Sequence, residues 1–224
     1  MARRSIIDTS TVSTKLLIAL TGLALFLYLL VHLGGNLLIL LGATTYNGYA
    51  AMLLSNPLLV PVEVGLVAIF IIHVYKTIAM WWDDRKARPE RYYRKEWAGD
   101  PSRKSIASST MIYTGLVTLI FIVLHVKMFK YGDVPLVGPA HQEDLYTLVT
   151  TTFHDPLWVA FYEFCLVLLG FHLWHGFGSA FESLGIHYSR SNRGIVRLGK
   201  VLAIIIAGGF FFIPIWVYFL GGRS

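Results

Sequence analysis

The sequence has little charge for its length and only one cysteine. Of its 224 residues, 14% are charged and 55% are hydrophobic, and the mean hydropathy is +0.60. Soluble domains carry about 25% charged residues, so this composition excludes a soluble enzyme and a nucleic-acid-binding protein, although the pI of 9.4 taken alone suggests the latter. The single Cys165 leaves no internal disulfide and no cysteine-based metal or iron–sulfur site. We find no internal repeat and no phosphate-binding glycine motif.

Five long apolar segments explain the composition, and together they hold only 8 of the 32 charged residues. Each is longer than the ~20 residues that a helix needs to cross a bilayer. The segments are continuously apolar and do not alternate, which argues against a barrel. We predict an all-α integral membrane protein, a five-transmembrane-helix bundle that forms one membrane domain over residues 1–224. The expected spans are 16–41, 58–82, 106–130, 156–183 and 197–220.

The basic residues indicate how the chain is threaded. The N-terminal stretch, the loop 83–105 and the last connection hold 15 of the 19 lysines and arginines, whereas the opposite side has three. Because basic residues favour the cytoplasmic side, we expect the N-terminus inside and the C-terminus outside. The basic and aromatic loop 83–105 either meets anionic lipid or docks a soluble partner.

Five of the eight histidines fall within predicted spans, which is costly in a membrane and usually marks function. Each of the first four spans contributes at least one, and the fifth has none. A single such histidine is often a hydrogen-bonded packing residue, but that reading is harder to apply to four spans at once. The five are His32, His73, His125, His172 and His175.

The depths of these histidines indicate two layers. His32 and His125 lie 16 and 19 residues from the inner ends of their spans, and His73 and His172 lie 9 and 11 residues deep. At the rise of an α-helix, the layers differ by roughly 11 Å in height. Two facing imidazoles at one depth are what a bis-histidine heme requires. We therefore predict two hemes b between helices one to four, forming an electron path. Depth does not choose between His172 and His175, which share a helix face.

Other sites fit the pattern less well. A zinc or di-iron site would want a carboxylate or a cysteine near the histidines, and none of the four has one within a turn on its own helix. A proton relay does not predict pairing by depth. Small residues beside the histidines suit either a flat cofactor or close helix packing; they are Gly34, Gly35, Gly170, Gly176 and Gly178.

The histidine segments resemble a known family, the single-chain, two-heme cytochrome b anchor subunits of succinate:quinone oxidoreductases (respiratory complex II and fumarate reductase). The resemblance covers nearly the whole chain, and its most specific part is the segment in span four. The matching segments are VHLGGN (31–36), IIHVYK (71–76), VLHVKM (123–128) and FHLWHGFGSAFESLG (171–185).

This resemblance implies roles for the histidines. In such anchors, spans one and three hold the distal heme, which corresponds to His32 and His125. Spans two and four hold the proximal heme, which corresponds to His73 and to the first histidine of FHLWH, His172; His175 would then support it. The distal and proximal pairs are the same pairs that the depths give.

The resemblance also implies partners and a setting. A flavoprotein with FAD and an iron–sulfur subunit would dock on the inner face, and a higher oligomer of the complex is compatible with this arrangement. The chain would pass electrons to menaquinone in the respiratory chain and tricarboxylic acid cycle, as a multi-pass subunit of a bacterial cytoplasmic membrane. It would carry no succinate chemistry itself. The alternatives are a fumarate reductase anchor working in reverse, the heme b anchor of another oxidoreductase, and a heme-free transporter.

Two carboxylates inside the spans are candidates for quinone or proton chemistry. Glu63 lies near the outer end of span two and Glu163 lies in span four. The alternative for each is a carboxylate solvated at the interface. Some family members have a glutamate two residues before the span-four ligand, but Gly170 stands there in this chain. A quinone site on the inner face remains an alternative.

Overall fold

The computed structural model describes residues 11–87, 106–137, 142–185 and 193–221. Within these ranges the regular structure is helical apart from two paired two-residue strands, β1 (Leu136–Val137) and β2 (Gln142–Glu143). Five helices are long and apolar enough to cross a membrane, which confirms the predicted five-span, all-α fold. They are α1 (Thr11–Leu37), extended by the 3-10 helix η1 (Leu38–Leu41), α3 (Leu59–Lys86), α4 (Ile106–Phe129), α6 (Pro156–Ser183) and α7 (Arg193–Leu220).

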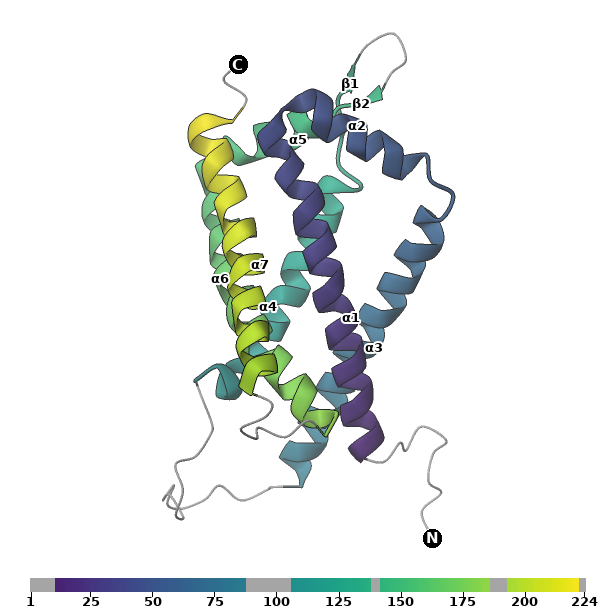
Figure 1. Cartoon of the computed structure of the whole chain (residues 1–224), viewed down its shortest axis with the longest axis vertical. Helices are drawn as coiled ribbons and strands as arrows, with labels where there is room; N and C mark the ends of the chain where they lie inside the picture. Colours follow the sequence, from purple (N-terminus) through teal and green to yellow (C-terminus); the bar gives the residue numbers. More distant parts are fainter. Residues whose placement is uncertain (1–10, 88–105, 138–141, 186–192, 222–224) are drawn as a thin grey trace.

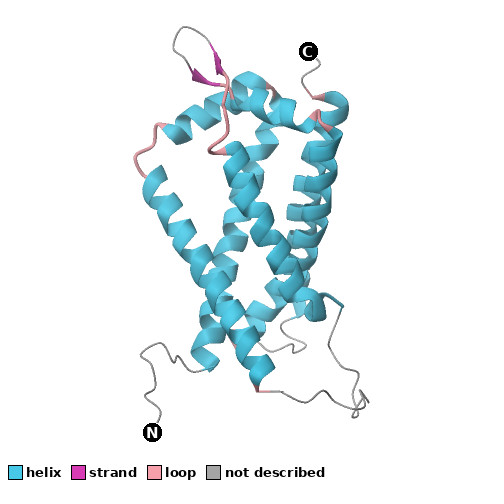
Figure 2. Ribbon diagram, turned by 180° about the vertical axis from the view of Figure 1, so that it is seen from behind, coloured by secondary structure: helices cyan, strands magenta, loops and turns pink. Residues whose placement is uncertain are grey.

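The long helices lie side by side along the longest axis of the molecule (Figures 1 and 2). The first and last described residues are at opposite ends of the bundle. We call the end at which α1 begins the inner end and the opposite end the outer end. The orientation of these ends in a bilayer stays a prediction.

Four helices surround the interior, and the fifth packs on the outside of them. Helix α1 contacts α3 and α6, and α4 contacts α6, while α7 packs mainly along α6 and also touches α1. The apolar face of α6 forms much of the core, with Leu166, Leu169 and Leu173 buried. Helix α6 therefore links the four-helix ring to α7.

Two short helices cover the outer end, where the sequence predicted only connections. They are α2 (Ala43–Leu54) and α5 (Leu145–Phe153). The chain turns from η1 into α2 at Gly42, whose φ of +93° favours glycine. Helix α5 begins at Asp144, whose carboxylate accepts a hydrogen bond from the backbone N–H of Thr147 at 3.0 Å.

Asp144 also joins the two short helices. The Asn47 side chain of α2 donates to Asp144 Oδ1 at 2.7 Å, and the backbone N–H of Tyr146 donates to Asn47 Oδ1 at 2.9 Å. Burial opposes ionisation of Asp144, but the hydrogen bonds from Thr147 and Asn47 outweigh it and lower the pKa of this carboxyl below its usual value. The ionised carboxylate thus holds α2 against α5.

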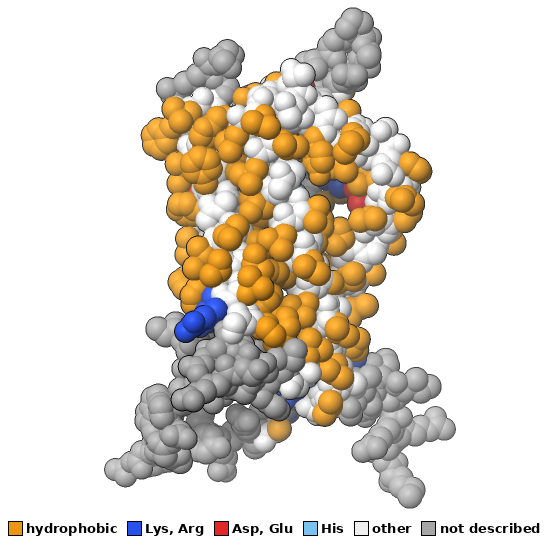
Figure 3. All heavy atoms as spheres, in the orientation of Figure 1, with side chains coloured by type: hydrophobic (Ala, Val, Ile, Leu, Met, Phe, Trp, Pro, Cys, Tyr) orange, Lys and Arg blue, Asp and Glu red, His pale blue; other side chains and the backbone are white. Residues whose placement is uncertain are grey.

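The surface suits a lipid environment. Hydrophobic side chains cover the middle of the face in Figure 3. Basic groups near the inner end lie over tryptophan rings, with the Arg85 guanidinium 4.4 Å from the Trp81 ring centre and Lys200 Nζ 5.0 Å from that of Trp174. Residues 88–105, which make up most of the predicted docking loop 83–105, lie outside the described residues.

Candidate functional site

A large cavity runs between α1, α3, α4 and α6. Its volume is about 1490 Å³, which exceeds the roughly 300–1,000 Å³ of a typical small-molecule pocket. Its walls include all five histidines predicted from the spans, and these histidines are half-buried because they face this space. The cavity therefore has room for more than one flat cofactor.

His32 of α1 and His125 of α4 face each other in the outer half of the cavity. Their ring centroids are 5.9 Å apart. Two imidazoles bonded at about 2 Å to opposite sides of one metal have ring centres roughly 6 Å apart. The spacing of this pair therefore fits bis-imidazole binding of an iron.

Different groups support the two outer imidazoles. His125 Nδ1 lies 3.3 Å from Tyr162 Oη, and the Tyr162 hydroxyl points on to Met128 Sδ at 3.7 Å. This places Nδ1–H as the donor and leaves Nε2 of His125 with its lone pair. The amide nitrogen of Asn36 lies 3.4 Å from Nδ1 and 3.5 Å from Nε2 of His32, and the Tyr28 ring stacks on His32 with centroids 5.4 Å apart.

His73 of α3 and His172 of α6 form a second pair nearer the inner end. The two rings are close enough to interact electrostatically. His73 Nδ1 lies 3.1 Å from Thr21 Oγ1 of α1, and His172 Nδ1 lies 3.4 Å from Thr114 Oγ1 of α4. The structure thus brings together the same two pairs that the predicted depths give.

The two levels are further apart than the sequence indicated. A Cβ on Gly22 would lie 3.1 Å from His73, which places His73 level with Gly22, ten residues from His32 on α1. Ten residues of α-helix correspond to about 15 Å. The sequence value of roughly 11 Å assumed that the inner ends of the spans align. The helices extend past the predicted inner ends by similar amounts, since α1 begins at Thr11 and α3 continues to Lys86, so the difference arises from how α3 is positioned along α1 and from the direction in which the side chains lean.

His175 also lies in the cavity wall, one turn inward of His172. It interacts electrostatically with both His172 and Glu182 of its own helix. His172, with its threonine partner on α4, is the member of the span-four histidines that is level with His73.

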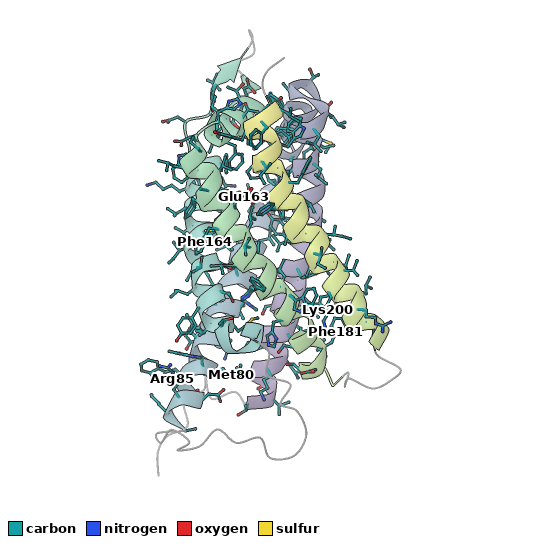
Figure 4. All side chains as sticks on the ribbon, turned by 90° about the vertical axis from the view of Figure 1, so that its left-hand side faces the viewer. Met80, Arg85, Glu163, Phe164, Phe181 and Lys200 are labelled. Carbon is teal, nitrogen blue, oxygen red and sulfur yellow. The ribbon has the colours of Figure 1, made fainter. Side chains whose placement is uncertain are left out.

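The two candidate carboxylates have different surroundings. Glu63 lies in the outer cavity wall and forms an ion pair with Lys130, which joins α3 to α4. Glu163 is not part of the cavity wall. Its two carboxylate oxygens are buried and, among the described residues, have no hydrogen-bond partner. Figure 4 shows Glu163 in the outer half of the bundle, far from Arg85.

The glycines beside the histidines have mainly packing roles. A Cβ on Gly35 would meet the Tyr49 ring at 2.7 Å, and one on Gly170 would meet Ala207 of α7 at 3.1 Å. A Cβ on Gly176 would lie 3.2 Å from Met111, and Gly34 and Gly178 have nothing within 4 Å.

The glycines that touch candidate ligands were missed from sequence. They are Gly22, against His73, and Gly115, against His172. The missed polar partners are Asn36, Lys130 and Tyr162, together with Thr21 and Thr114. Four of these residues could have been found from sequence, because Thr21-Gly22 and Thr114-Gly115 are the same pair of residues, each with its glycine ten residues before a histidine.

The donor set suits heme iron better than a small metal ion. The cavity offers neutral imidazoles in pairs. In three of them Nδ1 faces a hydroxyl, which leaves Nε2 free to bind an iron. Among the described residues, no three histidine, cysteine or acidic side chains come together as a metal-ion site. The residues present therefore suit heme b, for which His32 with His125 and His73 with His172 are the two candidate ligand pairs.

The fold and site define a multi-pass membrane protein with paired histidines inside its helix bundle. The chain matches the succinate dehydrogenase/fumarate reductase transmembrane subunit family over residues 84–213, which include His125 and His172. No curated protein and no solved structure matches the chain. The family match covers more than half of the sequence, so the chain belongs to this family.

Membership fixes the general function. The chain is a membrane anchor subunit of a succinate dehydrogenase or fumarate reductase, in a family that commonly binds heme b and quinone. It associates with the flavoprotein and iron–sulfur subunits of that complex.

Proposed function

We propose that the chain is a two-heme anchor that passes electrons from the iron–sulfur subunit to menaquinone during succinate oxidation. The observation that carries this proposal is the presence of two histidine pairs, at two levels, in one cavity. The pairs come from four different helices, and their levels are separated by about 15 Å of helix. Two redox centres so spaced would divide the ~30 Å hydrocarbon core into shorter electron-transfer steps.

The four histidines would act as axial ligands. His73 and His172 would hold the heme nearer the inner end, and His32 and His125 the heme nearer the outer end. The bound hemes supply one-electron redox chemistry, while the protein sets their positions and potentials. His175 would support the inner heme from the cavity wall.

We place the quinone site at the outer end of the cavity, beside Glu63 and Lys130. Reduction of a quinone takes up two protons, and this ion pair offers both a carboxylate and an ammonium group in the cavity wall. Tyr28 lies close enough to Glu63 to interact electrostatically and could orient a quinone oxygen. Glu163 is the second candidate for proton transfer because its buried oxygens have no partner among the described residues.

An outer quinone site would make use of the membrane potential. With the predicted orientation, electrons entering at the inner end move outward, from the negative to the positive side. Each charge moved across the full potential gains about 2.3 kcal/mol per 100 mV. This gain would assist electron transfer from succinate to menaquinone, whose low potential makes that step unfavourable. The soluble subunits would dock at the inner end.

A fumarate reductase anchor uses the same parts in the opposite direction and is the second candidate function. A single purification tests the assignment: the chain is isolated with its soluble partners, and reduced-minus-oxidised spectra are recorded. We expect b-type bands at two hemes per chain, reduced by succinate and reoxidised by a menaquinone analogue. Spectra with one heme or none would contradict the two-heme assignment. A lack of reduction by succinate, with reoxidation by fumarate, would favour the reverse direction.

A further inference from the structure

Helices α1 and α4 carry the same short sequence element at the same height. Residues 21–32 read TGLALFLYLLVH and residues 114–125 read TGLVTLIFIVLH. Each segment starts with a Thr-Gly pair and ends with a histidine of the outer pair, ten residues after the glycine. The likeness is hard to see in the sequence because the match is only twelve residues long and mostly apolar between its ends.

The two Thr-Gly pairs contact the inner histidines in the same way. Thr21 Oγ1 and Thr114 Oγ1 lie 3.1 and 3.4 Å from Nδ1 of His73 and of His172, respectively. A Cβ on the following glycine would lie 3.1 Å from Cε1 of His73 in one case and 3.3 Å from Cε1 of His172 in the other. The same two imidazole atoms therefore rest on the same two residues in both halves of the bundle.

The hydrogen-bond pattern fixes the direction of each contact. The Thr21 hydroxyl donates to the Leu17 carbonyl at 2.6 Å, and the Thr114 hydroxyl donates to the Met111 carbonyl at 3.0 Å. A hydroxyl has one proton, so each oxygen is left as an acceptor for the imidazole Nδ1–H. A neutral imidazole that donates from Nδ1 keeps its lone pair on Nε2, where a metal binds.

A backbone carbonyl completes each contact. The carbonyl of Ile18 lies close enough to His73, and that of Met111 close enough to His172, to add to the acceptor that each ring faces. Each of these carbonyls comes three residues before its threonine. The threonine oxygen and the neighbouring carbonyl oxygen thus form one acceptor surface on each helix. The imidazole ring can reach this surface because the adjacent glycine has no side chain.

We propose that Thr21 and Thr114 are positioning residues for the inner heme. Each would hold one axial histidine in its Nδ1–H tautomer, with Nε2 turned to the iron, while Gly22 and Gly115 provide the space for the ring. This rests on the proposed function, in which His73 and His172 bind that heme. Helices α1 and α4 then each serve both hemes, by giving a ligand to the outer one and an orienting surface to the inner one.

The acceptor also tunes the inner heme. A hydrogen bond from Nδ1–H makes the imidazole a stronger donor to iron, which favours the ferric state and lowers the midpoint potential. The outer histidine His125 has a different support, Tyr162, so the two hemes are tuned by separate groups. Removal of either threonine hydroxyl should therefore raise the midpoint potential of the inner heme and leave that of the outer heme unchanged.

The test is a spectroscopic redox titration of the complete complex with Thr21→Val and with Thr114→Val. Valine keeps the shape of threonine and removes the acceptor. We expect two hemes per chain, an upward shift of the inner midpoint potential alone, and heme binding weakened by about 10- to 100-fold, as is typical when a partner of a metal ligand is lost. Thr21→Ser and Thr114→Ser retain the hydroxyl and should restore the wild-type potential.

Thr118→Val is the matched control. Thr118 also lies on α4 and its hydroxyl donates to the Thr114 carbonyl at 2.8 Å, one turn away from the inner histidine, so both potentials should remain at their wild-type values. Unchanged potentials in both Thr→Val variants, or a shift of the outer heme alone, would overturn the proposal. If the valine variants do not assemble, Thr21→Ala and Thr114→Ala test the same loss with a smaller side chain.

Failure of the underlying function would look different. A wild-type complex without hemes, or a His73→Ala variant that keeps both, would remove the assignment of the ligands. A different outcome would contradict only the positioning role. In that case the wild type binds two hemes and His73→Ala loses one of them, but no threonine variant shifts a midpoint potential.

Discussion

The imidazole rings of His32 and His125 stand nearly perpendicular to each other, with an interplanar angle of 88°. They come from helices α1 and α4, and the two histidines are 93 residues apart in sequence. The other pair, His73 and His172, comes from α3 and α6, so each of the four helices that surround the cavity supplies one member of a pair. This arrangement makes the loss of a single histidine a test of one level at a time.

His73→Ala should remove the inner heme and lower the heme content to about one per chain, because one axial ligand of that level is lost. The content is measured by a pyridine hemochrome assay on the purified complex. His175→Ala is the comparison variant, since it removes a neighbouring imidazole of the same cavity wall that would support the inner heme without binding its iron, so both hemes should stay bound. Two hemes in His73→Ala, or one in His175→Ala, would show that the inner pair is assigned wrongly.

Glu63→Gln should slow the quinone reaction and leave both heme spectra in place. The substitution removes the ionised partner of Lys130 and the carboxylate that could exchange a proton with a bound quinone. Reoxidation of the reduced hemes by a soluble menaquinone analogue, followed in a stopped-flow instrument, gives the rate. Lys130→Met should slow the same reaction by breaking the same ion pair.

Glu163→Gln separates the two candidate carboxylates. If proton transfer uses only the Glu63 region, this variant should turn over at the wild-type rate. A slow Glu163→Gln with a normal Glu63→Gln would move the proton pathway away from the outer cavity wall.

Asp144→Asn should lower the stability of the outer end by about 1 kcal/mol at neutral pH, since one charge-assisted acceptor is lost. The pKa of Asp144 is lower in the folded protein than its usual value. The stabilisation is therefore present above the usual aspartate pKa and is lost as the pH falls through the lower folded value. Thermal unfolding of the detergent-solubilised complex between neutral and acid pH measures this effect.

In Asp144→Asn, the Tm should also depend less steeply on pH in the acid range than it does in the wild type. Asp133→Asn is the control, because Asp133 is exposed in the same connection, and its Tm should match the wild type. An Asp144→Asn protein with the wild-type Tm throughout the acid range would show that the link between α2 and α5 does not stabilise the fold.

Gly199→Ala should destabilise the packing of α7 on α6. A Cβ at this position would overlap Cδ1 of Phe177, so the ring or the helix has to move, at a cost of about 1–3 kcal/mol. Gly208→Ala on the same helix has nothing within 4 Å of the new Cβ and should leave the Tm unchanged or slightly raised. Equal Tm values for the two variants would contradict the contact.

The sequence was sufficient for the spans and for the pairing of histidines, but not for the outer end. Long apolar runs are determined by the thickness of the bilayer, and five of them are visible without any structure. The connections that contain α2 and α5 are short, and their helices are stabilised by the long-range contact between Asn47 and Asp144, which local sequence does not reveal.

The histidines of the candidate site were predictable from sequence, whereas the residues that contact them were not. A histidine inside an apolar span stands out because it is rare there. Threonine and glycine are common in membrane helices, so Thr21 and Gly22 carry no such signal until the structure places them against His73. The height difference was underestimated because the sequence does not show how neighbouring helices are positioned along one another, which the contact between His73 and Gly22 reveals.

One unbroken helix carries both His32 and the surface on which His73 rests. The vertical step between the two histidine levels is therefore set by the rise of ten residues along one helix, and lipid has little influence on it. A thinner or thicker bilayer changes the tilt of such helices but not the rise along each of them. The electron-transfer distance should accordingly stay constant when the cell alters its lipid composition, even where the rate of quinone entry from the surrounding membrane does not.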